Sequence, residues 1–179
     1  FGLAIFFLGM SAAFMGRLVE KFDPTLTGTV SAILYGSGIA LTGLAVQSQQ
    51  LWLLYASYGV IAGLGLGAGY VTPISTIIKW FPDRRGLATG LAIMGFGFAA
   101  LLTSPVAQFL MSSVGLSNTF YILGVGYFLI MIVSAQFIKR PTAEDLANFK
   151  GEGKEAVSLT GGLQMTANQA LKAKTFYLL

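Results

Sequence analysis

The sequence predicts an all-α, polytopic membrane helix bundle, and three observations support this fold class. Of the 179 residues, 55% are hydrophobic and only 10% are charged. A soluble domain normally carries about 25% charged residues, so this chain has too few to cover a surface in contact with water. The mean hydropathy is +0.74. The few charges also fall between long apolar runs rather than within them.

The apolar runs have the length of transmembrane helices. A hydrocarbon core of about 30 Å requires roughly 20 apolar residues in a helix. Four segments without any charged residue meet this requirement: residues 26–46, 51–78, 87–110 and 119–138. Residues 1–15 are also apolar and predict the last part of an earlier helix.

These spans predict the domain organisation. Residues 1–138 form the transmembrane part, 139–174 a polar cytoplasmic loop, and 175–179 the truncated start of a further helix. Because the chain begins and ends inside apolar runs, we expect it to be a piece of a longer protein.

The distribution of charge predicts the orientation. Connections 16–24 and 79–85 are charged, connections 47–50 and 111–118 are not, and every other charge follows residue 138. All eighteen charged residues (11 basic plus 7 acidic) therefore fall on one side. The positive-inside rule assigns this side to the cytoplasm. We expect a multi-pass protein of the cytoplasmic membrane, with the lipid bilayer and not nucleic acid as the partner of its net charge of +4.

The composition excludes most catalytic chemistry. The chain has no cysteine and no histidine, so it lacks thiolate nucleophiles, the commonest metal ligand and the usual general base near neutral pH. No carboxylate lies inside a span. We therefore expect no enzyme activity, no metal site and no cofactor.

Small residues recur at helical spacing in two spans, which favours close packing of helix backbones. In span 51–78 one stripe contains Gly59, Gly63 and Gly67, and a second stripe lies about 100° away. The second stripe consists of Tyr58, Gly65, Gly69, Thr72 and Thr76. In span 87–110 one face carries Gly86, Gly90, Gly97, Ala100, Ser104 and Gln108. The two stripes predict that span 51–78 is internal to the bundle.

Two polar side chains are candidates for a cavity. Tyr70 lies deep in its span beside Thr72-Pro73, where the proline leaves a backbone carbonyl without its helical partner and bends the helix. Gln108 lies near the outer end of its span. It either bonds to a neighbouring helix or lines an outer gate.

Several short runs resemble the major facilitator superfamily. The connection after residues 1–15 resembles the family's loop motif at Gly16, Glu20 and Lys21, but departs from it at Asp23 and Pro24. The runs GLGLGAGY (63–70), WFPDRRGLATG (80–90), GFG (95–97) and TSP (103–105) resemble the oxalate:formate antiporter family. The resemblance to the monocarboxylate porters is weaker.

The resemblance implies a fold and a function. It identifies the chain as the N-terminal half of a twelve-helix transporter, from the end of helix two through helix six, with substrate near the midplane between two halves. It implies secondary active transport of small organic anions, such as oxalate, formate or lactate. Tyr70 and Phe96 would supply cavity walls, while the basic groups for a mono- or dicarboxylate would come from the missing C-terminal half.

The charge distribution and the resemblance together predict roles for the remaining motif residues. Gating or topology on the cytoplasmic side would involve Gly16, Glu20, Lys21, Asp83, Arg84 and Arg85. Ser104-Pro105 replaces the glycine-proline pair often seen in antiporters, so exchange, symport and uniport all remain open. Other open hypotheses are a different solute (nitrate, a drug or a neutral metabolite) and a transporter-like sensor whose output is residues 139–174.

Overall fold

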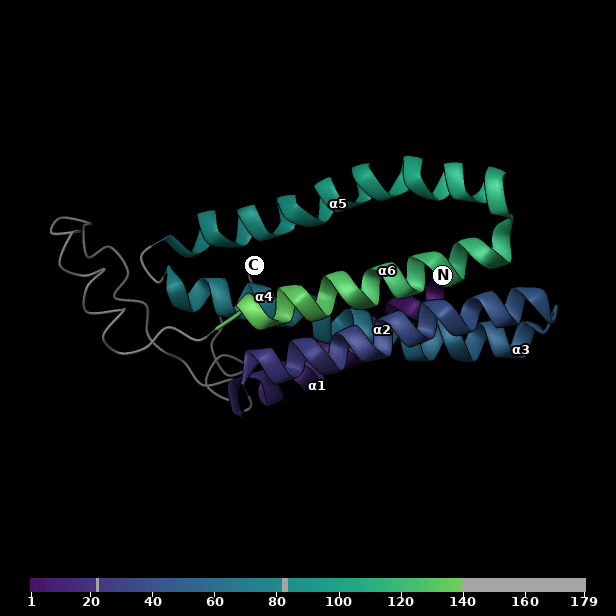
Figure 1. The fold of residues 1–179 in the computed structure, drawn as a ribbon. Helices are drawn as coiled ribbons and strands as arrows, with labels where there is room; N and C mark the ends of the chain where they lie inside the picture. Colours follow the sequence, from purple (N-terminus) through teal and green to yellow (C-terminus); the bar gives the residue numbers. More distant parts are fainter. Residues whose placement is uncertain (22, 82–83, 140–179) are drawn as a thin grey trace, which may run out of the picture. The chain divides into compact units, whose positions relative to one another are not determined.

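The computed structural model describes residues 1–21, 23–81 and 84–139, and in these ranges the chain is helical, without strands. Its elements, in chain order, are α1 (Gly2–Lys21), α2 (Pro24–Gln47), α3 (Leu51–Leu54), η1 (Tyr55–Ala62), α4 (Gly63–Trp80), α5 (Arg85–Val114) and α6 (Leu116–Phe137) (Figure 1). The predicted all-α membrane helix bundle is confirmed.

Four helical segments are long and apolar enough to cross a membrane. They are α2, the continuous segment Leu51–Trp80 formed by α3, η1 and α4, then α5 and α6. Each contains one of the charge-free spans, apart from the terminal residue Ile138, which follows α6. The apolar part of α1 covers Gly2–Met15 and is shorter.

Two connections differ from the prediction. The helix of α1 continues to Lys21 through most of the segment expected to be a loop. The expected connection 111–118 is reduced to Gly115, whose φ of 82° is readily adopted by glycine. The polar run before it stays helical, and the hydroxyls of Ser112 and Ser113 bond back to the carbonyl of Phe109 at 2.9 and 2.8 Å.

The π-helical segment η1 is a feature that the sequence periodicity did not indicate. It is fixed against α2 at two points. The hydroxyls of Thr42 and Ser57 lie 3.2 Å apart in the buried interface. At Gly38, an added Cβ would lie 2.6 Å from the backbone nitrogen of Ala62, so the two backbones touch.

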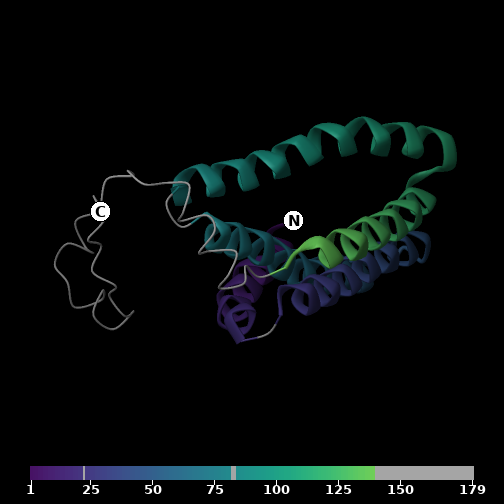
Figure 2. The same cartoon turned by 60° about the vertical axis from the view of Figure 1, so that its left-hand side comes forward.

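The core lies where α2 packs against α4 and α6, and where α1 packs against α4 (Figures 1 and 2). Its fully buried residues are small, such as Ala32, Ala45, Ala62 and Ala68. Membrane helices gain stability mainly from close backbone approach, because lipid tails are as apolar as leucine. The small-residue composition therefore holds this bundle together.

Buried hydroxyls join the helices. The Ser31 hydroxyl of α2 donates to the carbonyl of Gly65 at 2.7 Å, and the Ser11 hydroxyl of α1 donates to the carbonyl of Leu64 at 2.7 Å. Among the described residues, no buried side-chain nitrogen or oxygen lacks a partner. Polar groups in these interfaces therefore add hydrogen bonds without an uncompensated desolvation penalty.

Helix α5 stands apart from the other helices of this bundle in both views (Figures 1 and 2). All its residues are described, and only Ala88 near its start is buried. It contacts α4 and α6 far less than α2 contacts α6. Most of the surface of α5 is thus open to further helices or to lipid.

Candidate functional site

The candidate site is an aromatic pair formed by Tyr70 of α4 and Phe96 of α5. Their ring centroids lie 5.1 Å apart with an interplanar angle of 33°, a distance typical of a favourable aromatic contact. Tyr70 is 37% exposed and Phe96 is 39% exposed. The structure therefore brings together two of the three predicted cavity residues and leaves both accessible.

Local sequence explains how α4 presents Tyr70. Pro73 lacks a backbone N–H, so the carbonyl of Gly69 loses its usual helical donor. The helix nevertheless continues through Pro73 to Trp80. The buried Thr72 hydroxyl donates to the carbonyl of Ala68 at 2.8 Å, so this polar group is satisfied within its own helix. A phenol and a backbone carbonyl without its helical donor therefore occur next to each other in the chain.

The third predicted cavity residue lies elsewhere. Gln108 is exposed on α5, twelve residues beyond Phe96, which corresponds to ~18 Å along a helix. Ser104 and Pro105 are exposed on the intervening turn, and α5 continues through the proline to Val114. Gln108 is therefore not part of the Tyr70–Phe96 pair, and a role at an outer gate stays a prediction.

The first glycine stripe of span 51–78 faces α1. An added Cβ would lie 2.5 Å from the Leu3 side chain at Gly59, 2.9 Å from the Ala4 carbonyl oxygen at Gly63, and 2.5 Å from the Leu8 carbonyl oxygen at Gly67. These three glycines therefore lie where two helix backbones approach closely.

The glycine stripe of α5 has a different environment. A Cβ added at Gly90 or Gly97 would meet nothing within 4 Å, and the same holds for Gly86. The proposed packing role of Gly90 and Gly97 stays a prediction. It concerns a neighbour outside the described residues.

The sequence pattern did not lead us to predict the contribution of α2. The second stripe of span 51–78 meets α2, where Gly65 lies against the backbone of Tyr35 and Gly69 lies against Ser31. Tyr35 also packs on Tyr127 of α6, with ring centroids 5.5 Å apart. The small residues Ser31 and Gly38, at near-helical spacing, were the sequence signal that could have indicated this helix contact.

The charged turn between α4 and α5 is partly described. Arg84 and Arg85 are exposed at the start of α5. Asp83 lies outside the described residues. Residues Gly16, Glu20 and Lys21 belong to the last turns of α1, but their side chains are outside the description, so their gating role stays a prediction.

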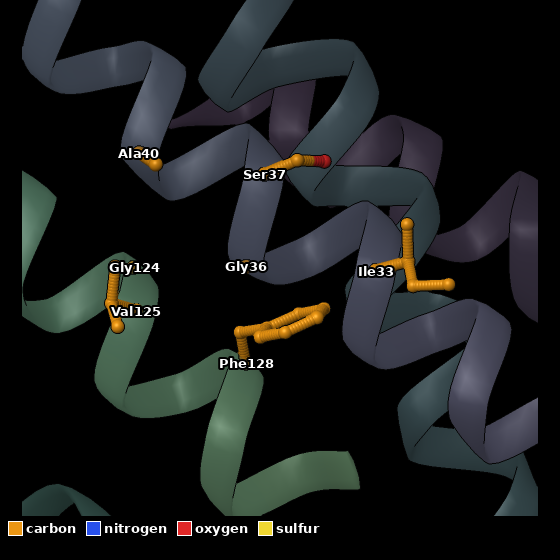
Figure 3. Close-up of a pocket in the computed structure, with 7 residues that line it drawn as sticks. All are labelled: Ile33, Gly36, Ser37, Ala40, Gly124, Val125 and Phe128. Carbon is orange, nitrogen blue, oxygen red and sulfur yellow. The ribbon is translucent and has the colours of Figure 1, made fainter.

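The grooves beside these helices are apolar. Figure 3 shows one between α2 and α6, of about 200 Å³, with the Phe128 ring beside Gly36 and with Ile33 and Val125 along its sides. The Ser37 hydroxyl at its edge donates to the carbonyl of Leu34 at 3.2 Å. A groove of this kind suits an alkyl chain and offers no counter-charge for an anion.

Comparison with known proteins identifies the family. The family model of the Major Facilitator Superfamily matches residues 1–178. The chain belongs to the major facilitator superfamily.

Three relatives illustrate where the chain lies within the superfamily. It is 34% identical over 151 residues to an uncharacterised MFS-type transporter of Escherichia coli (strain K12), YhjX, covering 84% of this chain and 37% of the relative. It is 30% identical over 128 residues to the oxalate:formate antiporter of Oxalobacter formigenes, covering 70% and 29%. It is 26% identical over 164 residues to monocarboxylate transporter 14 of Mus musculus, covering 87% and 31%.

The chain thus spans 37% or less of the length of each of these relatives. In the residues that the structure describes, this chain consists of helices and the turns between them. Within the described ranges, no group of three His, Cys, Asp or Glu residues is arranged to hold a metal ion.

Proposed function

We propose that this chain is the N-terminal half of a secondary active transporter that carries small mono- or dicarboxylates across the cytoplasmic membrane. The observation that supports this most strongly is the 30% identity to an oxalate:formate antiporter over 70% of the chain. Membership of the superfamily supports transport by rocking of two halves around a central site. The positive-inside rule supports cytoplasmic placement of the charged turns.

In this proposal the Tyr70–Phe96 pair forms part of the wall around the substrate. The phenol of Tyr70 donates a hydrogen bond to a substrate carboxylate oxygen, and the edge of the Phe96 ring presents its positive rim to the same group. The surrounding apolar helices lower the local dielectric constant. A low dielectric strengthens attraction between the anion and cations supplied by the C-terminal half.

The absence of charge in these spans is consistent with this division of roles. Residues 26–46, 51–78, 87–110 and 119–138 contain no charged side chain, so this half would bind a carboxylate through neutral donors and shape. We propose that the positive charge is contributed by the half that this chain does not include.

Transport by the full-length protein tests this proposal. We expect purified protein in proteoliposomes to accumulate labelled oxalate, formate or lactate, with excess unlabelled carboxylate competing. Tyr70→Phe should raise KM about tenfold or more, since a hydrogen bond to a charged group contributes about 1.5–3 kcal/mol. Uptake of nitrate or a neutral solute without uptake of any carboxylate would contradict the proposed substrate class.

A further inference from the structure

A second pocket lies between the ends of α4 and α6. Neither Tyr70 nor Phe96 lines it. It has a volume of about 240 Å³, with Pro73 and Ile77 on one side and Phe137 on the other. The indole N–H of Trp80 donates to the carbonyl of Lys139 at 2.9 Å. This bond ties the end of α4 to the segment Ile138–Lys139 that follows α6 and fixes the rim of the pocket.

Among the charged side chains that the structure describes at this end of the bundle, most are basic. Lys139 lines the pocket and is exposed. The charged residues with described side chains near this end of the bundle are Lys79, Arg84, Arg85, Lys139 and one acid, Asp23. Asp23 comes near through α2, because the Thr25 hydroxyl donates to the carbonyl of Ile138 at 3.0 Å. Among the described residues, Lys139 is the charged side chain that lines the pocket, and its ammonium group favours an anion.

The combination of walls and rim indicates the class of ligand. An apolar pocket suits an alkyl chain, and an ammonium group with a tryptophan at its mouth suits a headgroup at the membrane interface. Basic pockets between transmembrane helices on the cytoplasmic side are suited to acidic lipid headgroups. A free phosphate ion would gain nothing from the apolar walls.

We propose that this pocket binds one anionic phospholipid, with its phosphate beside Lys139 and the upper part of an acyl chain against Ile77 and Phe137. The inference rests on the proposed cytoplasmic orientation, where anionic lipids are available to the pocket. A bound lipid bridges α4 and α6 at the end where Trp80 and Lys139 already join them.

Lipid retention by the purified full-length protein tests this site. Native mass spectrometry from micelles containing phosphatidylglycerol and phosphatidylcholine should detect one preferentially retained phosphatidylglycerol. Lys139→Gln should lower this retention about fivefold, the effect of one basic residue near an acidic headgroup, and leave phosphatidylcholine unchanged. The Trp80–Lys139 hydrogen bond survives because its acceptor is a backbone carbonyl.

Two further variants and a competitor make the test specific. Lys21→Gln, at the end of α1 and on the same predicted side of the membrane, should retain phosphatidylglycerol like the wild type. Ile77→Trp should lower the retention of both lipids, because the larger side chain fills the pocket. If Ile77→Trp does not fold, Ile77→Phe is used in its place. Equal losses in Lys139→Gln and Lys21→Gln would overturn the proposal, as would full retention in the folded Ile77 variant.

Displacement of the lipid by inorganic phosphate would also overturn it, because a phosphate ion alone would then account for the site. No transport substrate is present in this measurement. A failed lipid site therefore leaves the carboxylate proposal intact, and a failed transport assay leaves the lipid result intact.

Discussion

Gly38→Leu is expected to prevent the full-length protein from accumulating in a folded state. A Cβ at this position would lie 2.6 Å from the backbone nitrogen and 2.8 Å from the Cα of Ala62 in η1. Overpacking usually costs about 1–3 kcal/mol. We expect more than about 3 kcal/mol here, because the colliding atoms belong to a backbone that cannot change rotamer. Size-exclusion profiles and thermal unfolding in detergent measure the effect.

Ser37→Leu is the matched control, since it places the same side chain one residue away on an exposed position of α2. Its hydroxyl bonds only within its own helix, to the carbonyl of Leu34. This variant should fold like the wild type. Equal thermal stability of Gly38→Leu and Ser37→Leu would show that α2 and η1 do not touch at Gly38.

The double substitution of Arg84 and Arg85 by glutamine should impair insertion in the correct orientation. The connection 79–85 would then keep only Lys79 and Asp83 and lose its excess of positive charge. At ~1 kcal/mol per basic residue near the membrane surface, the loss of two shifts the preference by roughly 30-fold. Membrane levels and protease accessibility of the connection measure this change, and the KM of the surviving protein should be unaltered.

The corresponding double substitution by lysine separates charge from geometry. Because the positive-inside rule counts lysine and arginine alike, this variant should insert like the wild type. A normal membrane level with a selective rise in KM, in either double variant, would place these residues at the substrate and contradict the topological role.

Much of the fold was predictable because the membrane imposes simple rules. The charge-free apolar spans had to be helices, since backbone groups in hydrocarbon must form their hydrogen bonds within their own segment. The stripe of Gly59, Gly63 and Gly67 indicated a close helix neighbour, and α1 occupies that position. Tyr70 and Phe96 were named together from the resemblance, and the structure places their rings 5.1 Å apart.

The remainder depended on information that local patterns do not contain. The π-helix at Tyr55–Ala62 changes which residues share a helix face, and no proline in this segment marks the change. The residues that it contacts, Thr42 and Gly38, lie in another span. The single-residue turn at Gly115 depends on a backbone angle that a polar run does not reveal. For Gly90 and Gly97, the sequence predicts a contact, but no described residue lies within 4 Å of an added Cβ.

The most direct test of the central claim, that Tyr70 and Phe96 line the substrate path, is thiol labelling. This chain has no cysteine, so Tyr70→Cys, Phe96→Cys and Val125→Cys are introduced singly into a full-length protein free of other cysteines. Val125 is 56% exposed and lines the apolar groove of Figure 3, where we expect lipid. Only a thiol reached by water ionises and reacts.

We expect an anionic, membrane-impermeant thiosulfonate reagent, supplied on both sides of proteoliposomes, to label the cysteines at positions 70 and 96. A transported carboxylate should slow this labelling, and the cysteine at position 125 should remain unlabelled. If the cysteines at positions 70 and 96 are as unreactive as the cysteine at position 125, Tyr70 and Phe96 do not line the substrate path. The same conclusion follows if no carboxylate changes their labelling rate.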